Sequence, residues 1–159
     1  MTPDAPQAAA AATPGPRHLP SSAYVDDAYY RWLSAVAADL ARPIVRAAEV
    51  SADTRTALAD LLVTEARLLD QQAHETWLSL FSEHCAYWIP ATWPATDPRT
   101  AITLEFHDRR RLLDRAARLA TGLAYSQAPA SRTARQFGGL EIWPDPDGPA
   151  SWRARCSFT

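Results

Sequence analysis

The spacing of the apolar residues changes along this chain, and the change limits the folds it can adopt. Before residue 82 the apolar side chains recur mainly at helical intervals, as in the stripe formed by Leu58, Leu62, Ala66 and Leu69. After residue 82 short alternating segments predominate, with one further helical pattern among them. Helices that come first and strands that follow predict an α+β fold, in which helices pack on one face of a curved antiparallel sheet.

The expected elements follow from this pattern and from residues that start or stop them. Ser51 is a good helix N-cap, Pro43 ends the first helix, and the segment PDPDGP at 144–149 is a strong turn signal. The expected helices span residues 26–41, 51–70, 74–81 and 108–121, with Gly122 as a stop. The expected strands span residues 85–89, 101–106, 133–143 and 151–159, with a loop at 127–131.

The last expected strand alternates apolar and polar residues, which predicts a half-buried strand. Its apolar positions are Trp152, Ala154, Cys156 and Phe158. In the strand over 133–143, Gly138 and Gly139 are expected to break the regular pattern.

Composition divides the chain into three parts. Residues 1–22 are rich in Ala and Pro and predict a disordered tail, residues 23–50 a helical extension, and residues 51–159 a single domain. No basic segment followed by a long apolar run begins the chain, and no segment approaches a membrane-spanning length. We therefore expect a cytoplasmic protein with no membrane partner.

The charge balance argues against a nucleic-acid partner. Sixteen basic residues, all Arg, stand against eighteen acidic ones, for a net charge of −2. Cys85 and Cys156 are too few for a disulfide scaffold and too far apart for a zinc ribbon. Two buried thiols in a reducing compartment are the expected state.

The histidines do not predict a metal site. A Rieske cluster needs two Cys and two His in close pairs, which Cys85 and Cys156 cannot supply. An iron site from His74, His107 and Asp108 is arithmetically possible, but their spacing does not favour it. We expect no metal on this chain.

A general acid/base pair is the main catalytic alternative. The candidates are Asp70, His74, His107 and Asp108, since an Asp and a His in an apolar pocket carry such chemistry in many α+β domains. The competing interpretation is that both Asp residues end helices and that both His residues lie at the surface.

The arginines of the helix at 108–121 also leave two interpretations. Arg115 and Arg118 lie one turn apart, and either they face a partner or a buried carboxylate such as Glu65, or they belong to a solvated face.

Two motifs carry a family resemblance. The segment EARLLDQQAHETWLSLFSEHCAYWIP at 65–90 and the segment LLDRAARLATGLAYSQAPASRT at 112–133 resemble the small, or β, subunit of bacterial aromatic-ring-hydroxylating dioxygenases. With the strand AITLEF between them, the resemblance covers roughly residues 55–143. It implies a cone-shaped fold like that of nuclear transport factor 2 and scytalone dehydratase.

The resemblance also implies a role. In this family the α subunit carries the Rieske cluster, the mononuclear iron and the substrate pocket, and the β subunit supports an assembly that commonly alternates α and β subunits around a three-fold axis. The complex adds both atoms of dioxygen to an aromatic ring during aromatic catabolism, with electrons from NADH through a reductase and often a ferredoxin. By resemblance no residue here is catalytic. The structural or interface residues implied are Tyr87, Trp88, Pro90, Arg115, Arg118, Ser131 and Arg132.

Three departures from the family pattern affect these expectations. The segment QFGGLEI follows the second motif in place of the family's usual Ser-Asn-Val, and Glu83 and His84 replace a pair of acids. The chain stops at Thr159 inside an expected strand, whereas the family continues through further long strands. We therefore expect a truncated chain or fragment, an incomplete sheet, and residues 151–159 at an open sheet edge.

Two other functions stay open on the residues alone. One is a stand-alone cone-fold isomerase or dehydratase that uses the Asp–His pair, and the other is a binding-only cone domain.

Overall fold

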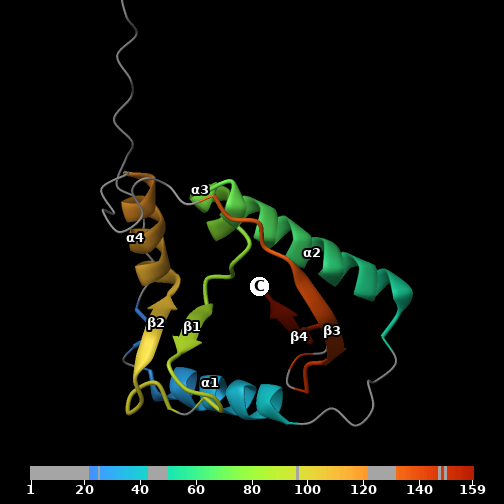
Figure 1. The fold of residues 1–159 in the computed structure, drawn as a ribbon. Helices are drawn as coiled ribbons and strands as arrows, with labels where there is room; N and C mark the ends of the chain where they lie inside the picture. Colours follow the sequence, from blue (N-terminus) through green and yellow to red (C-terminus); the bar gives the residue numbers. More distant parts are fainter. Residues whose placement is uncertain are drawn as a thin grey trace, which may run out of the picture.

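The computed structural model describes residues 22–24, 26–42, 50–95, 97–121, 132–146, 148 and 150–159. Within them the elements follow the expected order, with three helices, two strands, one helix and two strands (Figure 1). The helices are α1 (Asp27–Ala41), α2 (Ala52–Asp70), α3 (His74–Leu78) and α4 (Arg109–Ala120). The strands are β1 (Ala86–Pro90), β2 (Thr103–Asp108), β3 (Phe137–Pro144) and β4 (Trp152–Phe158).

The helix boundaries agree closely with the signals in the sequence. Ser51 caps α2, because its hydroxyl accepts a hydrogen bond from the backbone N–H of Thr54 at 3.1 Å. Helix α1 ends at Ala41, and the following residue, Arg42, is extended with ψ 142°, the conformation favoured before a proline. The expected tail up to residue 21, the stop at Gly122 and the loop at 127–131 lie outside the described residues.

Helix α3 is shorter than expected and ends at Leu78 rather than at residue 81. The backbone N–H groups of Ser79 and Leu80 bond to carbonyls three residues back, and the Ser79 hydroxyl bonds to the Thr76 carbonyl at 2.6 Å. A serine hydroxyl that competes for a helical carbonyl favours a tightened final turn over continued α-helix. The chain then leaves the helix and enters β1.

The described strands form two separate antiparallel pairs, which we call the β1–β2 pair and the β3–β4 pair. In the first, Tyr87 lies opposite His107 and Trp88 opposite Phe106, and the register shifts at Pro90, the residue expected to stop the strand. In the second, the register shifts between Gly138 and Glu141. The α+β class is confirmed, but the single curved sheet is represented in the described residues by these two pairs.

Strand β4 lies at an open edge in the part of the chain that the structure describes. Its hydrogen-bonded neighbour there is β3, and no strand pairs with its other side. This position agrees with the expectation for residues 151–159.

The largest buried cluster joins α3 and α4 beneath the β1–β2 pair. Trp77, Leu78, Leu112 and Ala116 are buried together, and Tyr87 of β1 packs against them. In Figure 1 these elements form one side of the molecule, whereas the β3–β4 pair lies apart from them. The second motif of the sequence therefore begins in the core, at Leu112.

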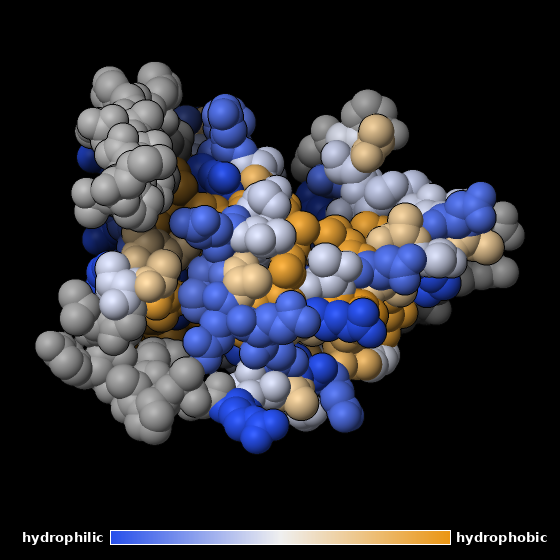
Figure 2. All heavy atoms as spheres, turned by 90° about the horizontal axis from the view of Figure 1, so that it is seen from above, coloured by the Kyte–Doolittle hydropathy of each residue, from blue (hydrophilic) through white to orange (hydrophobic). Residues whose placement is uncertain are grey.

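The apolar stripe of α2 is less buried than its spacing indicated. No residue of α2 is buried, and Leu61 is 46% exposed. Figure 2 views the molecule from above and shows hydrophobic and hydrophilic residues side by side over the middle of the visible surface. Helical spacing predicts which residues share a face, but burial requires a second element against that face. None of the described helices is long and apolar enough to cross a membrane.

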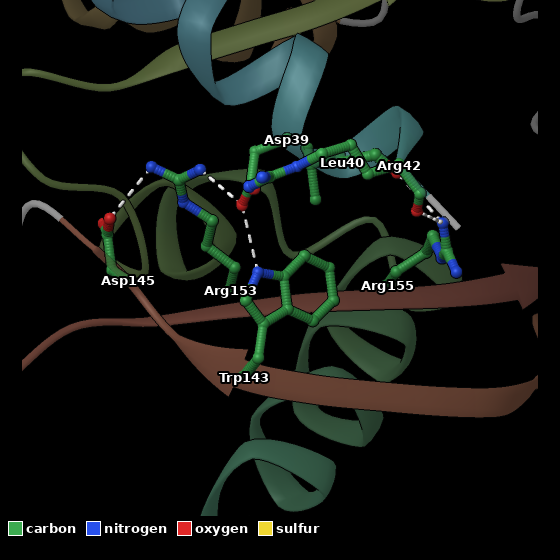
Figure 3. A network of polar contacts seen from close by, with 7 residues as sticks. All are labelled: Asp39, Leu40, Arg42, Trp143, Asp145, Arg153 and Arg155. Carbon is green, nitrogen blue, oxygen red and sulfur yellow. Dashed lines mark hydrogen bonds and ion pairs between the residues drawn. The ribbon is translucent and has the colours of Figure 1, made fainter. Parts of the chain in front are cut away.

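Strand β4 also departs from its pattern. Arg153 is its buried residue, at 7% exposed, whereas Trp152 and Phe158 are 39% and 73% exposed. Arg153 is buried because its guanidinium pairs with carboxylates of α1 and of the turn after β3, as Figure 3 shows. The side of β4 that carries Arg153 is therefore more buried than the side that carries Trp152 and Phe158.

Candidate functional site

The β1–β2 pair carries a polar and aromatic cluster that faces α3 and α4. Tyr87 stacks on His107 with ring centroids 6.3 Å apart, and it meets Trp77 edge to face at 5.6 Å. Tyr87 and His107 lie on the same face of the pair because they are opposite each other in the strand register. The cluster is the part of the described structure where several candidate residues meet.

Glu105 is the centre of the polar contacts in this cluster. One of its carboxylate oxygens lies 2.5 Å from Nε2 of His107, and the other accepts a hydrogen bond from Nη1 of Arg115 at 2.6 Å. The side chains of Glu105 and Arg115 are each 26% exposed. The Arg115 guanidinium therefore neutralises Glu105 and holds it against His107.

Glu105 was not among the residues predicted from the sequence, although a signal for it was present. In the strand TLEFHD, Glu105 and His107 are two residues apart, so they lie on the same face. That alternation was sufficient to propose the contact. A buried carboxylate such as Glu65 was one of the open alternatives for Arg115. The carboxylate that Arg115 binds is Glu105, and Glu65 accepts a hydrogen bond from the Trp77 indole at 3.3 Å.

His74 lies close to this cluster without joining a carboxylate. Burial lowers the pKa of His74, and the positive charge of Arg115 lowers it further. Its Nδ1 atom and that of His107 are buried and have no hydrogen-bond partner among the described residues. His74 is therefore favoured in its neutral form.

Asp70 is occupied by a different contact. Its carboxylate accepts hydrogen bonds from the backbone N–H of Arg135 at 2.8 Å and from the Thr133 hydroxyl at 2.7 Å, and it pairs with the Arg135 guanidinium. The backbone hydrogen bond is the main cause of a lowered pKa. A groove of about 380 Å³ next to this pair is lined by residues that include Ala66 and Phe137.

Asp108 is a helix cap. It is 2% exposed, and Oδ1 accepts a hydrogen bond from the backbone N–H of Arg111 at 3.0 Å. Oδ2 accepts hydrogen bonds from the Ser22 hydroxyl and from the backbone N–H of Ala23, at 3.0 and 2.8 Å. The cap function expected as the alternative for Asp108 is therefore present.

The Asp–His pair proposed from the sequence does not form among the described residues. Neither Asp70 nor Asp108 makes a hydrogen bond or ion pair with His74 or His107 in the described part of the chain. Both carboxylates bind backbone N–H groups, which satisfies them and leaves the histidines to other neighbours. Across the described ranges, no three His, Cys, Asp or Glu side chains come together in a way that could hold a metal ion.

The proposed structural or interface residues fall into two groups. Tyr87, Trp88 and Arg115 are partly buried and make internal contacts, with Trp88 meeting the Phe106 ring edge to face at 6.2 Å. Pro90 closes β1 and is also partly buried. Arg118 and Arg132 are exposed, whereas Ser131 lies outside the described residues.

Known proteins are similar to the part of the chain that contains the cluster around Glu105. A family model described as ring hydroxylating beta subunit matches residues 64–159. The toluate 1,2-dioxygenase subunit beta of Pseudomonas putida is 33% identical over 98 residues, which cover 58% of this chain and 60% of that protein. The benzoate 1,2-dioxygenase subunit beta of Acinetobacter baylyi is 32% identical over 91 residues, which cover 54% and 53%.

Two further similarities concern a third relative and a solved structure. The small oxygenase component of the p-cumate 2,3-dioxygenase system of Pseudomonas putida is 38% identical over 94 residues, which cover 56% of this chain and 51% of that protein. A solved structure of naphthalene 1,2-dioxygenase with indole bound in the active site aligns with a TM-score of 0.53 and 18% identity, over 69% of this chain and 68% of that one. At that identity the likeness concerns the fold, and it confirms the expected α+β cone.

The chain spans little more than half the length of the curated relatives it matches. The family match nevertheless includes both motifs, the aromatic strand β1 and the polar cluster around Glu105. The chain belongs to the ring-hydroxylating β-subunit family.

Proposed function

We propose that this chain is a non-catalytic β subunit that supports the assembly of a bacterial aromatic-ring dioxygenase with its α subunit. The observation that carries the proposal is the family match over residues 64–159. The relatives named above are themselves β subunits or small oxygenase components of dioxygenases. A cone domain is a suitable support, because its helices and strands leave a broad outer surface for other subunits.

The contacts of the candidate residues support a structural role. Asp70 and Asp108 satisfy backbone N–H groups, and Glu105 is neutralised by Arg115. A general acid or base must reach a reacting group, and these carboxylates are already committed to the fold. Among the described residues no such contact is seen for the side chain of the exposed Arg118, which is our first candidate for a contact with the α subunit.

The chemistry of the proposed complex resides on the partner. We propose that the Rieske cluster and the mononuclear iron are on the α subunit, and that the complex adds dioxygen to an aromatic ring with electrons from NADH. The relatives named for toluate, benzoate and p-cumate point to aromatic carboxylates as the first substrates to test. We also propose a cytoplasmic location, for which the two free cysteines are suited.

Co-expression tests this proposal. The chain is produced with a tagged α subunit from the adjacent gene, recognised by its Cys-X-His and Cys-X-X-His motifs, and the purified α subunit is analysed by size-exclusion chromatography. We expect the chain to co-elute with the α subunit at a constant ratio. An α subunit that assembles alone and never retains the chain contradicts the proposal.

A charge reversal sharpens the test. Arg118→Glu is expected to reduce retention of the chain by about tenfold, because it replaces a donor with a repelling charge at an exposed position. The matched control is Arg55→Glu, which reverses another exposed arginine, in α2, that precedes the matched residues 64–159. Equal retention of both variants would remove Arg118 from the proposed interface.

A further inference from the structure

The β3–β4 pair is attached to the rest of the molecule in an unusual way. Its two strands bond to each other, and no other described strand extends them. The side of the pair that carries Trp143, Arg153 and Arg155 faces the end of α1 (Figure 3). Polar contacts on this side therefore have a large part in fixing where the pair lies.

Asp39 of α1 is the central acceptor in these contacts. Its side chain is 7% exposed, and Oδ2 accepts hydrogen bonds from Nη1 of Arg153 at 2.5 Å and from the Trp143 indole at 3.0 Å. The other amino group of Arg153 donates to Asp145 at 2.9 Å. One buried carboxylate thus binds both strands of the pair at once.

Arg155 adds a second link at the end of the same helix. Its Nη1 donates to the carbonyls of Leu40 and Arg42, at 3.0 and 3.2 Å, and its Nε donates to Glu141 of β3 at 2.7 Å. Carbonyls in the last turn of a helix have no partner within the helix, so this arginine satisfies groups that would otherwise need water.

The other end of α1 is bound to the β1–β2 side of the molecule. The Tyr29 hydroxyl donates to the Cys85 carbonyl at 3.3 Å, and the Tyr30 ring lies 6.1 Å from that of Phe106. Helix α1 therefore contacts both strand pairs, although it precedes the matched residues 64–159.

We propose that α1 is a clamp that sets the position of the β3–β4 pair, with Asp39 as its positioning residue. A buried carboxylate and a buried guanidinium attract each other strongly only in a narrow geometry. Displacement of the pair would separate Arg153 from Asp39, and Asp145 and the exposed Arg42 would then be the ionic partners that remain to these two buried groups. The contact is therefore directional, unlike apolar packing, which tolerates sliding. On this view α1 (Asp27–Ala41) is part of the folded domain and not an added extension. The inference does not depend on the proposed function.

Hydrogen exchange of the full-length chain tests the clamp. Arg153→Met keeps much of the side-chain volume but removes the positive charge that pairs with Asp39. We expect the amides of β3 and β4 to exchange about tenfold faster or more, while those of β1 and β2 keep their protection. Asp27→Asn is the control, since it removes a carboxylate that is 78% exposed on the same helix, and it should leave both pairs unchanged.

Two milder variants keep the test decisive if Arg153→Met fails to fold. Trp143→Phe removes one hydrogen bond to Asp39, and Asp39→Asn combined with Arg153→Met removes both charges together. Each is expected to speed exchange in β3 and β4 selectively. Unchanged protection of β3 and β4 in these variants, or an equal loss of protection in both pairs, would overturn the proposal.

Discussion

The two strand pairs are held in place by different physical means. In the β1–β2 pair, the Phe106 ring lies 5.4 Å from that of Tyr24 and 6.2 Å from that of Trp88, and the opposite face packs on Trp77 through Tyr87. In the β3–β4 pair, the best-buried contact is the ion pair between Arg153 and Asp39. The hydrophobic contribution of ring burial is proportional to the apolar area and is non-directional, whereas a buried ion pair needs a defined geometry and depends on both partners.

This difference has a consequence for how each pair fails. Loss of one aromatic contact should weaken the β1–β2 side in proportion to the area removed, because the other rings stay in place. Loss of one charge should instead release the β3–β4 pair as a unit. Variants on the β1–β2 side test one half of this comparison, and the variants at Arg153 and Trp143 test the other half.

The largest effect is expected in the core beneath the β1–β2 pair. Leu112 is 0% exposed, so Leu112→Ala should lower the free energy of unfolding by about 3 kcal/mol, from lost burial and the cavity left behind. Urea unfolding measures the change. Leu104→Ala is the control at a position 69% exposed, and it should change stability by less than about 0.5 kcal/mol. Similar losses in both variants would contradict the placement of the core.

A smaller effect is expected at the cap of α4. Asp108→Ala removes the acceptor for the backbone N–H groups of Arg111 and Ala23, and it should cost about 1–2 kcal/mol in urea unfolding. Asp108→Asn keeps one acceptor oxygen for Arg111 but turns an amide NH2 toward the backbone N–H of Ala23, so it should recover only part of that loss. An Asn variant as stable as the wild type would mean that the contacts of Oδ2 add nothing to the cap.

Removal of the Tyr24 hydroxyl should lower the stability of the fold by a smaller amount still. The Tyr24 hydroxyl donates to the Phe106 carbonyl at 2.7 Å, so Tyr24→Phe should cost about 1 kcal/mol while the ring stacking is kept. Tyr30→Phe is the matched control, because no hydrogen bond is seen for its hydroxyl within the described residues. The difference in thermal midpoint between the two variants measures the contribution. A null difference would assign the role of Tyr24 to its ring alone.

The smallest effect concerns pH and His74. Burial, with Arg115 nearby, lowers the folded-state pKa of His74, so the unfolded chain binds the proton more readily. The neutral histidine therefore contributes stability above the unfolded pKa of about 6.5, and this is lost as pH falls toward the lower folded pKa. Thermal midpoints of the wild type and His74→Gln between pH 7.5 and pH 5 (roughly the titration range of histidine) measure it. Between pH 7.5 and pH 5 (roughly the same range) the thermal midpoint of His74→Gln should fall less than that of the wild type. Parallel curves for the two proteins would contradict the assignment of this pH dependence to His74.

The sequence predicted the elements better than their surroundings. The N-cap at Ser51, the end of α1 before a proline and the stop of β1 at Pro90 are local effects, and all three are present. The short α3 was missed because the Ser79 hydroxyl ends the helix within an otherwise helical pattern. Local chemistry therefore decided the boundaries named here, both those that were right and the early end of α3. The starts of β2 at Thr103 and of β3 at Phe137 also come later than the residues 101 and 133 expected from the sequence.

The candidate site was predicted only in part. The sequence placed Tyr87 and Arg115 among the important residues, and both meet in the cluster around Glu105. Asp70 and Asp108 were proposed as partners of histidines. Asp70 instead binds the backbone N–H of Arg135, and Asp108 binds those of Ala23 and of Arg111 at the start of α4. Such pairings depend on which segments meet in space, and spacing in one sequence does not contain that information.

The sequence by itself determined the order of helices and strands, the α+β class and the resemblance to a β subunit, since these follow from local periodicity and short motifs. The tertiary structure alone decided that Arg153 is buried while Trp152 is exposed, that the stripe of α2 is only partly buried, and that Asp39 binds both strands of a distant pair. The physical reason is that burial and ion pairing are properties of two surfaces in contact. A pattern along one strand or helix specifies only one of those surfaces.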